Sequence, residues 1–335
     1  MSVDKGLVKQ FAEKYSYRKY MIKRYLEMFG REETVQFLEA NERSLMPTLR
    51  CNTLRIDEQD FVKLFTKKGF VLEKIPRIAY GYRVFKAPFP LGATNEYLLG
   101  FYFLQSEASM IPVQVLDPKP GEIVIDLAAA PGGKTTQIAQ FMKNKGAIIG
   151  IDINRKRIKS LRSNLSRCGV YNALIIRMDG RQIPDLDMQA DKVLLDAPCT
   201  GEGLIPRDPT RKTSRELKDI LYVAELQKSL IDAALTCLKP GGSLVYSTCA
   251  IAPEENEFVL DHALKNEGIQ VKKIDFSGGT PAFTKVFEKS LHPSIKEARR
   301  FYPHKDKTEG FFVCKIQKNT VNIKSGKNDH ISAFN

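Results

Sequence analysis

Short apolar runs alternate with amphipathic stretches through the middle of the chain, from residue 122 to residue 248. The amphipathic stretches repeat apolar residues at helical spacing and keep charged residues on the opposite face. The apolar runs are rich in Ile, Val and Leu, which is typical of strands buried on both faces of a parallel sheet. This alternation predicts an α/β fold with a doubly wound, Rossmann-like sheet and right-handed crossovers. The runs are EIVIDL, AIIGID, ALIIRM, DKVLLD and GSLVYS.

The chain before residue 111 has a different pattern. Residues 1–45 have helical periodicity and predict two or three amphipathic helices, one of which ends at Gly30. The stretches TLRCNTLRI and YGYRVFKAP are strand-like, and DEQDFVKLFTKKGF between them has helical spacing behind an acidic cap. Strand, helix and strand in this order predict a small α+β module at residues 46–110.

The remaining boundaries follow from the same pattern. The stretch EYLLGFYFLQSEASMIPVQVLDPKPGE predicts a helical approach closed by a turn that contains Pro and Gly. We place the larger α/β domain at residues 111–317. Residues 318–335 are polar and have no periodicity, so we expect a mobile tail there.

Composition narrows the class of protein. No apolar run approaches the roughly 20 residues that a membrane span needs, and the basic N-terminus lacks the apolar core and cleavage site of a signal peptide. We therefore expect a cytoplasmic protein without a membrane partner. We also expect a monomer. The six cysteines form no CxxC pair and the four histidines have no metal-ligand spacing, so we expect free thiols and no metal.

The charge points to a polyanionic partner. The 52 Lys and Arg residues outnumber the 39 Asp and Glu residues, which gives a net charge of +13. Basic side chains that neutralise phosphates release counterions, and this gives salt-sensitive binding to nucleic acid. A solvated basic surface is the alternative.

The loop DLAAAPGGKTT follows the first apolar run and resembles a nucleotide-binding loop. A P-loop needs a glycine where this chain has Ala128, although Gly133, Lys134 and Thr135 fit the end of that motif. The run DKVLLD also resembles the strand that holds Mg²⁺ in such enzymes. A P-loop ATPase therefore remains an alternative at this point.

Four aspartates favour an adenosyl group over a triphosphate. They end four successive predicted strands, and ligands of doubly wound folds bind beyond the carboxyl ends of strands. The second could bridge a ribose diol, and the third is placed for an adenine amino group. Four carboxylates would repel a triphosphate, so we expect S-adenosylmethionine as the cofactor. These residues are Asp126, Asp152, Asp179 and Asp196.

Two cysteines follow adjacent predicted strands and would share one crevice. Cys199 lies in LLDAPCTGEG and Cys249 in YSTCAIAPEENE. Carbon 5 of cytosine takes a methyl group only after a thiolate has added to carbon 6, and a second base must then remove the proton from carbon 5. Our hypothesis is that Cys249 is the nucleophile, Cys199 assists release, and Asp196 is the acid at ring nitrogen 3. The cysteine in DAPC disfavours an amino-group methyltransferase.

These motifs, with LRCNTLRI upstream, resemble the Nol/Nop/Sun family of RNA cytosine-5 methyltransferases, particularly its archaeal members that act on tRNA. The resemblance covers roughly residues 45–317 and implies a Rossmann-like methyltransferase sheet with a small RNA-recognition-like module before it. It implies that Cys249 is the covalent nucleophile and that Cys199 assists release. It also implies a set of residues that hold S-adenosylmethionine: Ala128, Ala129, Ala130, Pro131, Gly132, Gly133, Lys134, Asp152, Arg157, Asp179 and Asp196.

The expected partner is therefore RNA, with tRNA favoured and ribosomal RNA as the alternative. A target cytosine must leave its stack to reach a thiolate, so basic residues near Cys199 are candidates for phosphate contacts. Basic residues interleaved with tyrosines near the N-terminus are further candidates, although helical spacing could bury about half of those tyrosines. A catalytically idle assembly factor is a further alternative. The candidate RNA-binding residues are Arg207, Arg211, Lys212, Arg18, Lys19, Lys23 and Arg24.

Overall fold

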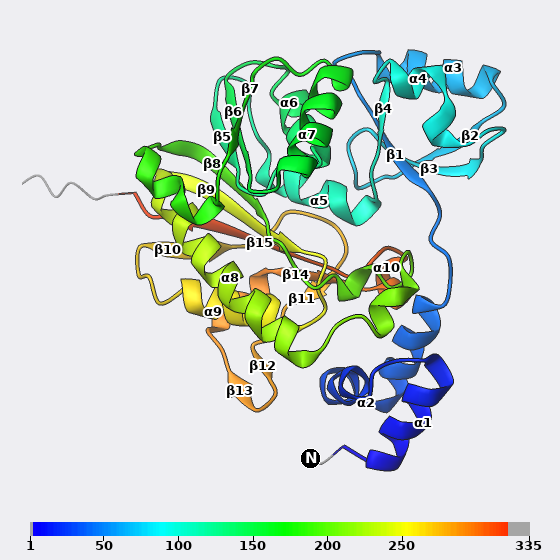
Figure 1. The fold of residues 1–335 in the computed structure, drawn as a ribbon, viewed down its shortest axis with the longest axis vertical. Coiled ribbons are helices and arrows are strands. Elements are labelled where there is room, and N and C mark those ends of the chain that lie inside the picture. The colour runs from blue at the N-terminus through cyan, green and yellow to red at the C-terminus, as the bar shows by residue number, and fades with distance from the viewer. Residues whose placement is uncertain (1–2, 321–335) are drawn as a thin grey trace, which may run out of the picture.

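The computed structural model describes residues 3–320, and the predicted mobile tail lies outside this range except for its first three residues. The N-terminal helices α1 (Lys5–Tyr15) and α2 (Lys19–Asn41) pack together at one end of the molecule (Figure 1). Gly30 has a φ of 74° and kinks α2, because only glycine adopts this conformation at low cost. The predicted interruption of the helix at Gly30 is confirmed.

The small α+β module forms at the other end of the molecule (Figure 1). Its antiparallel sheet has the strand order β2-β3-β1-β4 and packs on α3 through a core that includes Phe61, Phe65 and Tyr102. The prediction of one continuous helical approach after this module was wrong, because the stretch contains a strand between two helices. The elements are β1 (Thr48–Cys51), α3 (Glu58–Lys67), β2 (Val71–Lys74), β3 (Gly81–Lys86), α4 (Asn95–Leu98), β4 (Tyr102–Leu104) and α5 (Glu107–Leu116).

The large sheet has the order β11-β14-β15-β9-β8-β5-β6-β7, with β10 paired to β15. Strands β5 to β9 are parallel to one another, which confirms the Rossmann-like prediction. Strands β10, β14 and β15 are antiparallel and were not predicted.

The elements of this domain follow the alternation that the sequence predicts up to β9. They are β5 (Ile123–Asp126), α6 (Gly133–Phe141), β6 (Ala147–Asp152), α7 (Arg155–Cys168), β7 (Ala173–Arg177), β8 (Ala190–Asp196), α8 (Leu217–Thr236), β9 (Leu238–Thr248), α9 (Glu257–Ala263), β10 (Ile269–Lys272), β11 (Thr280–Pro281), β12 (Lys285–Val286), β13 (Lys289–Ser290), β14 (Arg299–Phe301), α10 (Pro303–Asp306) and β15 (Phe311–Lys318).

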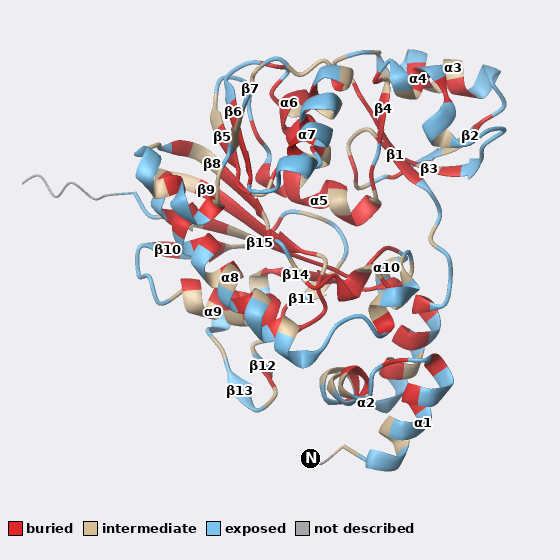
Figure 2. Ribbon diagram, viewed as in Figure 1, coloured by how far each residue is buried: buried red, intermediate tan, exposed pale blue. Residues whose placement is uncertain are grey.

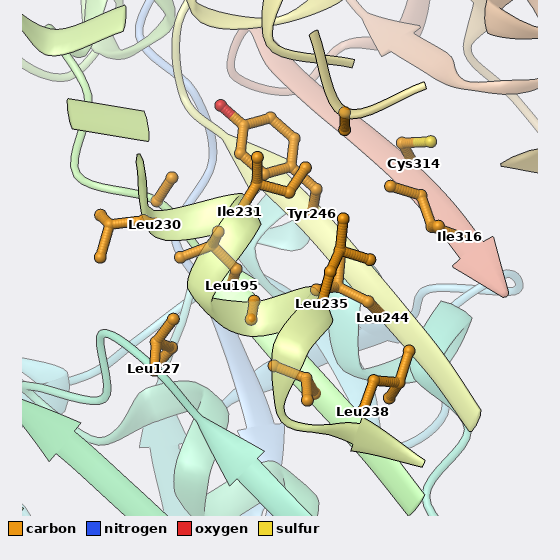
Figure 3. Close-up of a cluster of buried hydrophobic side chains, with 14 of the residues drawn as sticks. Leu127, Leu195, Leu230, Ile231, Leu235, Leu238, Leu244, Tyr246, Cys314 and Ile316 are labelled. Carbon is orange, nitrogen blue, oxygen red and sulfur yellow. The ribbon is translucent and has the colours of Figure 1, made fainter. Parts of the chain in front are cut away.

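Both faces of this sheet are covered, so its strands are buried over most of their length (Figure 2). Successive strand residues point to opposite faces. Leu195 and Leu244 pack with Leu230 and Ile231 of α8 on one face (Figure 3). Their neighbours along the strands pack under α5 and α6 on the other face. No helix between residues 3 and 320 is long and apolar enough to span a bilayer.

The N-terminal helices dock behind the loops that follow β8 and β9. Ile205 and Ile251 from these two loops belong to the same apolar cluster as Tyr25 and Phe37 of α2. A shared core of this kind fixes the loops relative to the helices, because close-packed interiors resist displacement. The N-terminal tyrosines Tyr15, Tyr17 and Tyr25 are buried, as the helical spacing allows.

Candidate active site

A cavity of about 450 Å³ opens beyond the carboxyl ends of the parallel strands. This volume lies within the range of small-molecule sites. Apolar side chains and carboxylates line it together, which suits a ligand that has both an aromatic base and hydroxyl groups. Its lining includes Leu127, Ala128, Asp152, Ile153, Arg157, Asp179, Gly180, Pro198, Tyr222 and Leu226.

Two of the predicted aspartates point into this cavity from neighbouring strands. Asp152 ends β6 and is buried, and it accepts hydrogen bonds from the backbone N–H groups of Ala130 (3.2 Å) and Asn154 (2.8 Å). Asp179 follows β7 and pairs with Arg181 at 2.6 Å. The hydrogen bond from Arg181 lowers the pKa of Asp179, so this carboxylate stays charged.

Asp126 is the last residue of β5 and directly precedes Leu127, which lines the cavity. Its Oδ2 accepts a hydrogen bond from the Thr135 hydroxyl at 2.7 Å, but its buried Oδ1 has no partner among the described residues. Burial raises the pKa of Asp126 to about 7. A buried, partly satisfied carboxylate of this kind favours a cationic ligand nearby, and the amino-acid end of S-adenosylmethionine is cationic. The residues present therefore fit this cofactor.

The loop from Ala128 to Lys134 joins β5 to α6 and shapes the cavity wall. Ala129 and Ala130 are buried against α7. Gly132 has a φ of 106° and is the N-cap residue of α6, and a Cβ there would lie 2.9 Å from Leu161 Cδ1. The backbone conformation therefore favours glycine at this position, and a larger residue would also displace the end of the Leu161 side chain. Pro131 is exposed at the outer turn of the loop.

The two predicted thiols lie side by side. Cys199 Sγ is 2.9 Å from Cys249 Sγ, since the loops after β8 and β9 meet at the same edge of the sheet. The hydrogen bond with Cys249, together with burial, raises the pKa of Cys199 well above its usual value. The Cys199 thiol therefore holds its proton more tightly than a free cysteine does.

Asp196 lies at the end of β8, close to the thiols. Its Oδ2 accepts a hydrogen bond from Lys134 Nζ at 2.6 Å, and its Oδ1 accepts one from the Ser247 hydroxyl at 2.7 Å. Lys134 Nζ also donates to the Ser109 hydroxyl at 3.0 Å. Lys134 and Asp196 therefore belong to the thiol end of the site and are not among the residues that line the 450 Å³ cavity.

Two residues that the sequence analysis missed hold the cysteine loops. Glu255 accepts hydrogen bonds from the Thr200 N–H (2.8 Å) and from Gln227 (3.2 Å). Asn256 accepts a hydrogen bond from the Thr248 hydroxyl at 2.6 Å and donates to the Ala250 carbonyl at 3.0 Å. Both residues are buried. The run of polar residues in APEENE after an apolar strand was the available sequence signal.

A third missed residue, Arg50, connects the small module to the cofactor loop. It is fully buried on β1, and its guanidinium donates to Gln105 (2.6 Å), the Gly133 carbonyl (2.9 Å) and the Thr136 hydroxyl (2.8 Å). Burial lowers the pKa of Arg50 to about 10. These bonds fix the start of α6 to the small module.

The predicted RNA-binding residues divide into two groups. Arg24 donates to Glu254 at 2.9 Å, and Lys212 is buried with its Nζ 2.6 Å from Glu42. Arg207 pairs with the buried Glu309, and Arg211 donates to Asp208 (2.9 Å) and to the Thr200 carbonyl (2.8 Å). These four side chains have partners within the protein that their spacing in sequence did not reveal. Arg18, Lys19 and Lys23 form the second group and are exposed, although Arg18 Nε donates to the Thr213 carbonyl at 2.9 Å and Lys23 Nζ lies 3.7 Å from Glu27.

Comparison with known proteins identifies the family. The family model described as 16S rRNA methyltransferase RsmB/F matches residues 113–317. The model described as the N-terminal domain of 16S rRNA methyltransferase RsmF matches residues 19–107. A crystal structure of a methyltransferase homolog from Pyrococcus horikoshii is 41% identical, with a TM-score of 0.86, and the match covers 94% of this chain and 100% of that one.

Curated relatives include enzymes named for two kinds of RNA. The tRNA (cytosine(49)-C(5))-methyltransferase of Pyrococcus abyssi is 37% identical over 90% of this chain and 96% of its own length. The 28S rRNA (cytosine(4447)-C(5))-methyltransferase of Homo sapiens is 43% identical over 93% of this chain. The chain spans between 39% and 55% of the length of this human protein and its eukaryotic counterparts. The chain belongs to the RsmB/F family of methyltransferases, the Nol/Nop/Sun family whose motifs its sequence carries.

Proposed function

We propose that this protein methylates carbon 5 of cytosine in RNA, with S-adenosylmethionine as the methyl donor. The observation that carries the proposal is the pair of thiols, 2.9 Å apart, at the carboxyl edge of a sheet that also holds a carboxylate-lined cavity. Neither feature alone specifies this chemistry, since such cavities occur in many nucleotide-binding folds. Their combination supports covalent activation of a pyrimidine beside a methyl donor.

The proposed cofactor residues are the loop Ala128–Lys134 with Asp152, Arg157 and Asp179, and Asp196 at the thiol end. When bound, S-adenosylmethionine supplies an electrophilic methyl group. Asp152 is placed to accept hydrogen bonds from ribose hydroxyls, and Asp179 to accept one from the adenine amino group. Leu127 and Pro198 provide the apolar surface that an adenine ring requires.

The two thiols and Asp196 have separate roles in the reaction of the cytosine base. The Cys249 thiolate forms a bond to carbon 6 of the cytosine, and Asp196 is the proposed acid at ring nitrogen 3, where negative charge develops. Carbon 5 is then nucleophilic and accepts the methyl group. A base removes the proton from carbon 5, the bond from Cys249 to carbon 6 breaks, and the aromatic ring returns. Cys199 is placed to assist this release.

The favoured substrate is tRNA, and ribosomal RNA is the alternative. Purified protein should transfer labelled methyl groups from S-adenosylmethionine to unmodified tRNA, and the label should be recovered as 5-methylcytidine by mass spectrometry. Label from ribosomal RNA alone would keep the chemistry and overturn the substrate. Label in a different nucleoside, or in neither RNA despite cofactor binding, would contradict the proposal.

Asp152→Asn is expected to weaken S-adenosylmethionine binding by roughly 10- to 100-fold. Hydrogen bonds to a charged partner contribute about 1.5–3 kcal/mol, and the amide keeps the size of the side chain but loses the charge. Isothermal titration calorimetry measures the effect directly. Asp185→Asn, on an exposed residue that does not line the cavity, is the matched control. Equal affinities for the two variants would remove Asp152 from the cofactor site.

Two alternatives from the sequence have different weight after the comparisons. Membership of a methyltransferase family weighs against a P-loop ATPase. A catalytically idle assembly factor would not need two thiols in contact or the buried network that holds them.

We propose that the exposed Arg18, Lys19 and Lys23 contribute to RNA binding, together with the small module at residues 46–110 and the catalytic domain at residues 111–317.

A further inference from the structure

A second cavity, of about 510 Å³, lies at the edge of the large sheet opposite to the active site. It is formed where β8 and β9 begin and where β10 and β15 end, and these four strands are neighbours in the sheet (Figure 1). Lysine is the most frequent residue in its lining. The proposed function does not use this cavity. The lining residues are Glu122, Asp191, Lys192, Lys239, Pro240, Gly241, Gly242, Ser243, Lys272, Lys273, Lys315 and Gln317.

The register of the strands brings like charges together. Lys272 on β10 lies directly opposite Lys315 on β15. Gln317, two residues further along β15, pairs with Ser243, which in turn pairs with Lys192 on β8. Like charges directly opposite each other on adjacent strands destabilise a sheet. The fold therefore gains nothing from this arrangement by itself, and a local conflict of this kind is typical of a binding site.

The acidic residues at the cavity do not neutralise all of its lysines. Asp191 accepts a hydrogen bond from the Ile123 N–H at 2.8 Å and pairs with Lys239 at 2.7 Å, and Glu122 lies 3.4 Å from Lys192. Within residues 3–320, no carboxylate lies within 4.0 Å of the ammonium groups of the three other lysines. These are Lys272, Lys273 and Lys315.

Burial makes the positive charge of Lys315 less favourable. Burial, and after it the charge of Lys192, lowers the pKa of Lys315. A group whose cationic form is disfavoured by its surroundings is stabilised by a nearby anion. Asp117 and Glu122 act on Lys315 in the opposite direction to Lys192, but the pKa stays lowered, so a phosphate in the cavity would add negative charge where the protein supplies too little.

We propose that this lysine cavity binds phosphate groups of the substrate RNA at nucleotides distant from the target cytosine. The inference rests on the proposed function, because it takes the RNA of that function as its ligand. From Ser243 to Cys249 the chain advances six residues along and beyond β9, which corresponds to about 20 Å at 3.3 Å per residue. The cavity would therefore contribute affinity and orientation and would not contact the reacting base.

The test removes three charges and measures RNA binding and methyl transfer separately. The variant carries Lys272→Gln, Lys273→Gln and Lys315→Gln. The control carries Lys265→Gln, Lys285→Gln and Lys296→Gln, three exposed lysines that do not line the cavity and that change the net charge equally. Fluorescence anisotropy with tRNA and with a ribosomal RNA fragment, at several salt concentrations, gives the dissociation constants. A double variant, Lys272→Gln with Lys273→Gln, keeps the more buried Lys315 if the triple variant unfolds.

The expected result is roughly 10-fold weaker RNA binding than the control and a salt slope smaller by about 2 to 3. The KM for RNA should rise, with kcat at saturating RNA and the affinity for S-adenosylmethionine unchanged. RNA affinity and salt slope equal to those of the control would overturn the inference. The inference would also be overturned if the triple variant lost binding of inorganic pyrophosphate but kept its affinity for RNA. Because anisotropy needs no methyl transfer, failure of the wild-type protein to methylate RNA would contradict the proposed function separately.

Discussion

Cys249→Ala is expected to lower the rate of methyl transfer to RNA by at least about 10³-fold, which corresponds to about 4 kcal/mol in the activation free energy. Without the thiolate, carbon 5 of cytosine remains too weak a nucleophile to take the methyl group. Affinity for S-adenosylmethionine should not change, because Cys249 does not line the cofactor cavity. Single-turnover transfer from labelled cofactor measures the rate, and Cys237→Ala, at a buried cysteine distant from the site, controls for loss of a thiol.

The order of the two thiols is tested by the complementary variant. Cys199→Ala keeps the nucleophile and removes the group placed to assist release, so a covalent complex of protein and RNA should accumulate and survive denaturing electrophoresis. Cys249→Ala should give no such complex. Accumulation with Cys249→Ala, and none with Cys199→Ala, would reverse the two roles. Undiminished transfer by the Cys249 variant would exclude covalent catalysis by that residue.

The sequence predicted the parts of the site that depend on local pattern. Each of the parallel strands is an apolar run that ends at or near an aspartate or a cysteine, and a parallel sheet gathers such ends at one edge. Cys199 and Cys249 are 50 residues apart and still meet, because β8 and β9 are adjacent and parallel. The topology follows from the alternation of strands and helices, which is visible in one sequence.

The antiparallel half of the sheet could not be predicted in the same way. Strand β15 lies between β9 and β14, although β9 ends more than 60 residues before it begins. Such pairing depends on the three-dimensional arrangement of distant segments and leaves no local signal. The short strand β14 contains Arg299 and Arg300, so its sequence has the pattern of a polar segment and not that of a buried strand.

The basic residues show the same limit. Lys212 is a candidate because it follows Cys199 closely in the chain, and Arg24 because it is interleaved with tyrosines, yet each pairs with a glutamate distant in the chain. Glu42 lies 170 residues from Lys212, and Glu254 lies 230 residues from Arg24. Spacing along a helix indicates which residues share a face, but it does not show what covers that face. The lysine cavity was not predicted for the opposite reason. Its lysines come from separate strands that only the fold brings together, so no local pattern indicates it.

Loss of the buried ion pair between Arg300 and Glu257 is expected to have the largest effect on stability. Both side chains are at most 1% exposed. Arg300 Nε donates to Glu257 at 2.6 Å, and its Nη1 donates to the Ile251 carbonyl at 2.9 Å, two residues after Cys249. Arg300→Met leaves a buried carboxylate without its cation, so the free energy of unfolding should fall by about 3–5 kcal/mol. Urea denaturation measures this change.

A double variant distinguishes two contributions to the free energy of unfolding. One is the stabilisation that the ion pair provides, and the other is the cost of leaving one buried charge without its partner. Arg300→Met with Glu257→Gln removes both charges, so it should be more stable than Arg300→Met alone. Lys63→Met breaks an exposed pair with Asp60 whose side chains are 69% and 67% exposed, and it should change the free energy of unfolding by less than about 1 kcal/mol. Equal losses for the buried and the exposed variant would contradict this account. Because Arg300 also holds the Ile251 carbonyl, folded Arg300→Met protein should methylate more slowly than wild type, which ties the stability of the core to the position of the nucleophile.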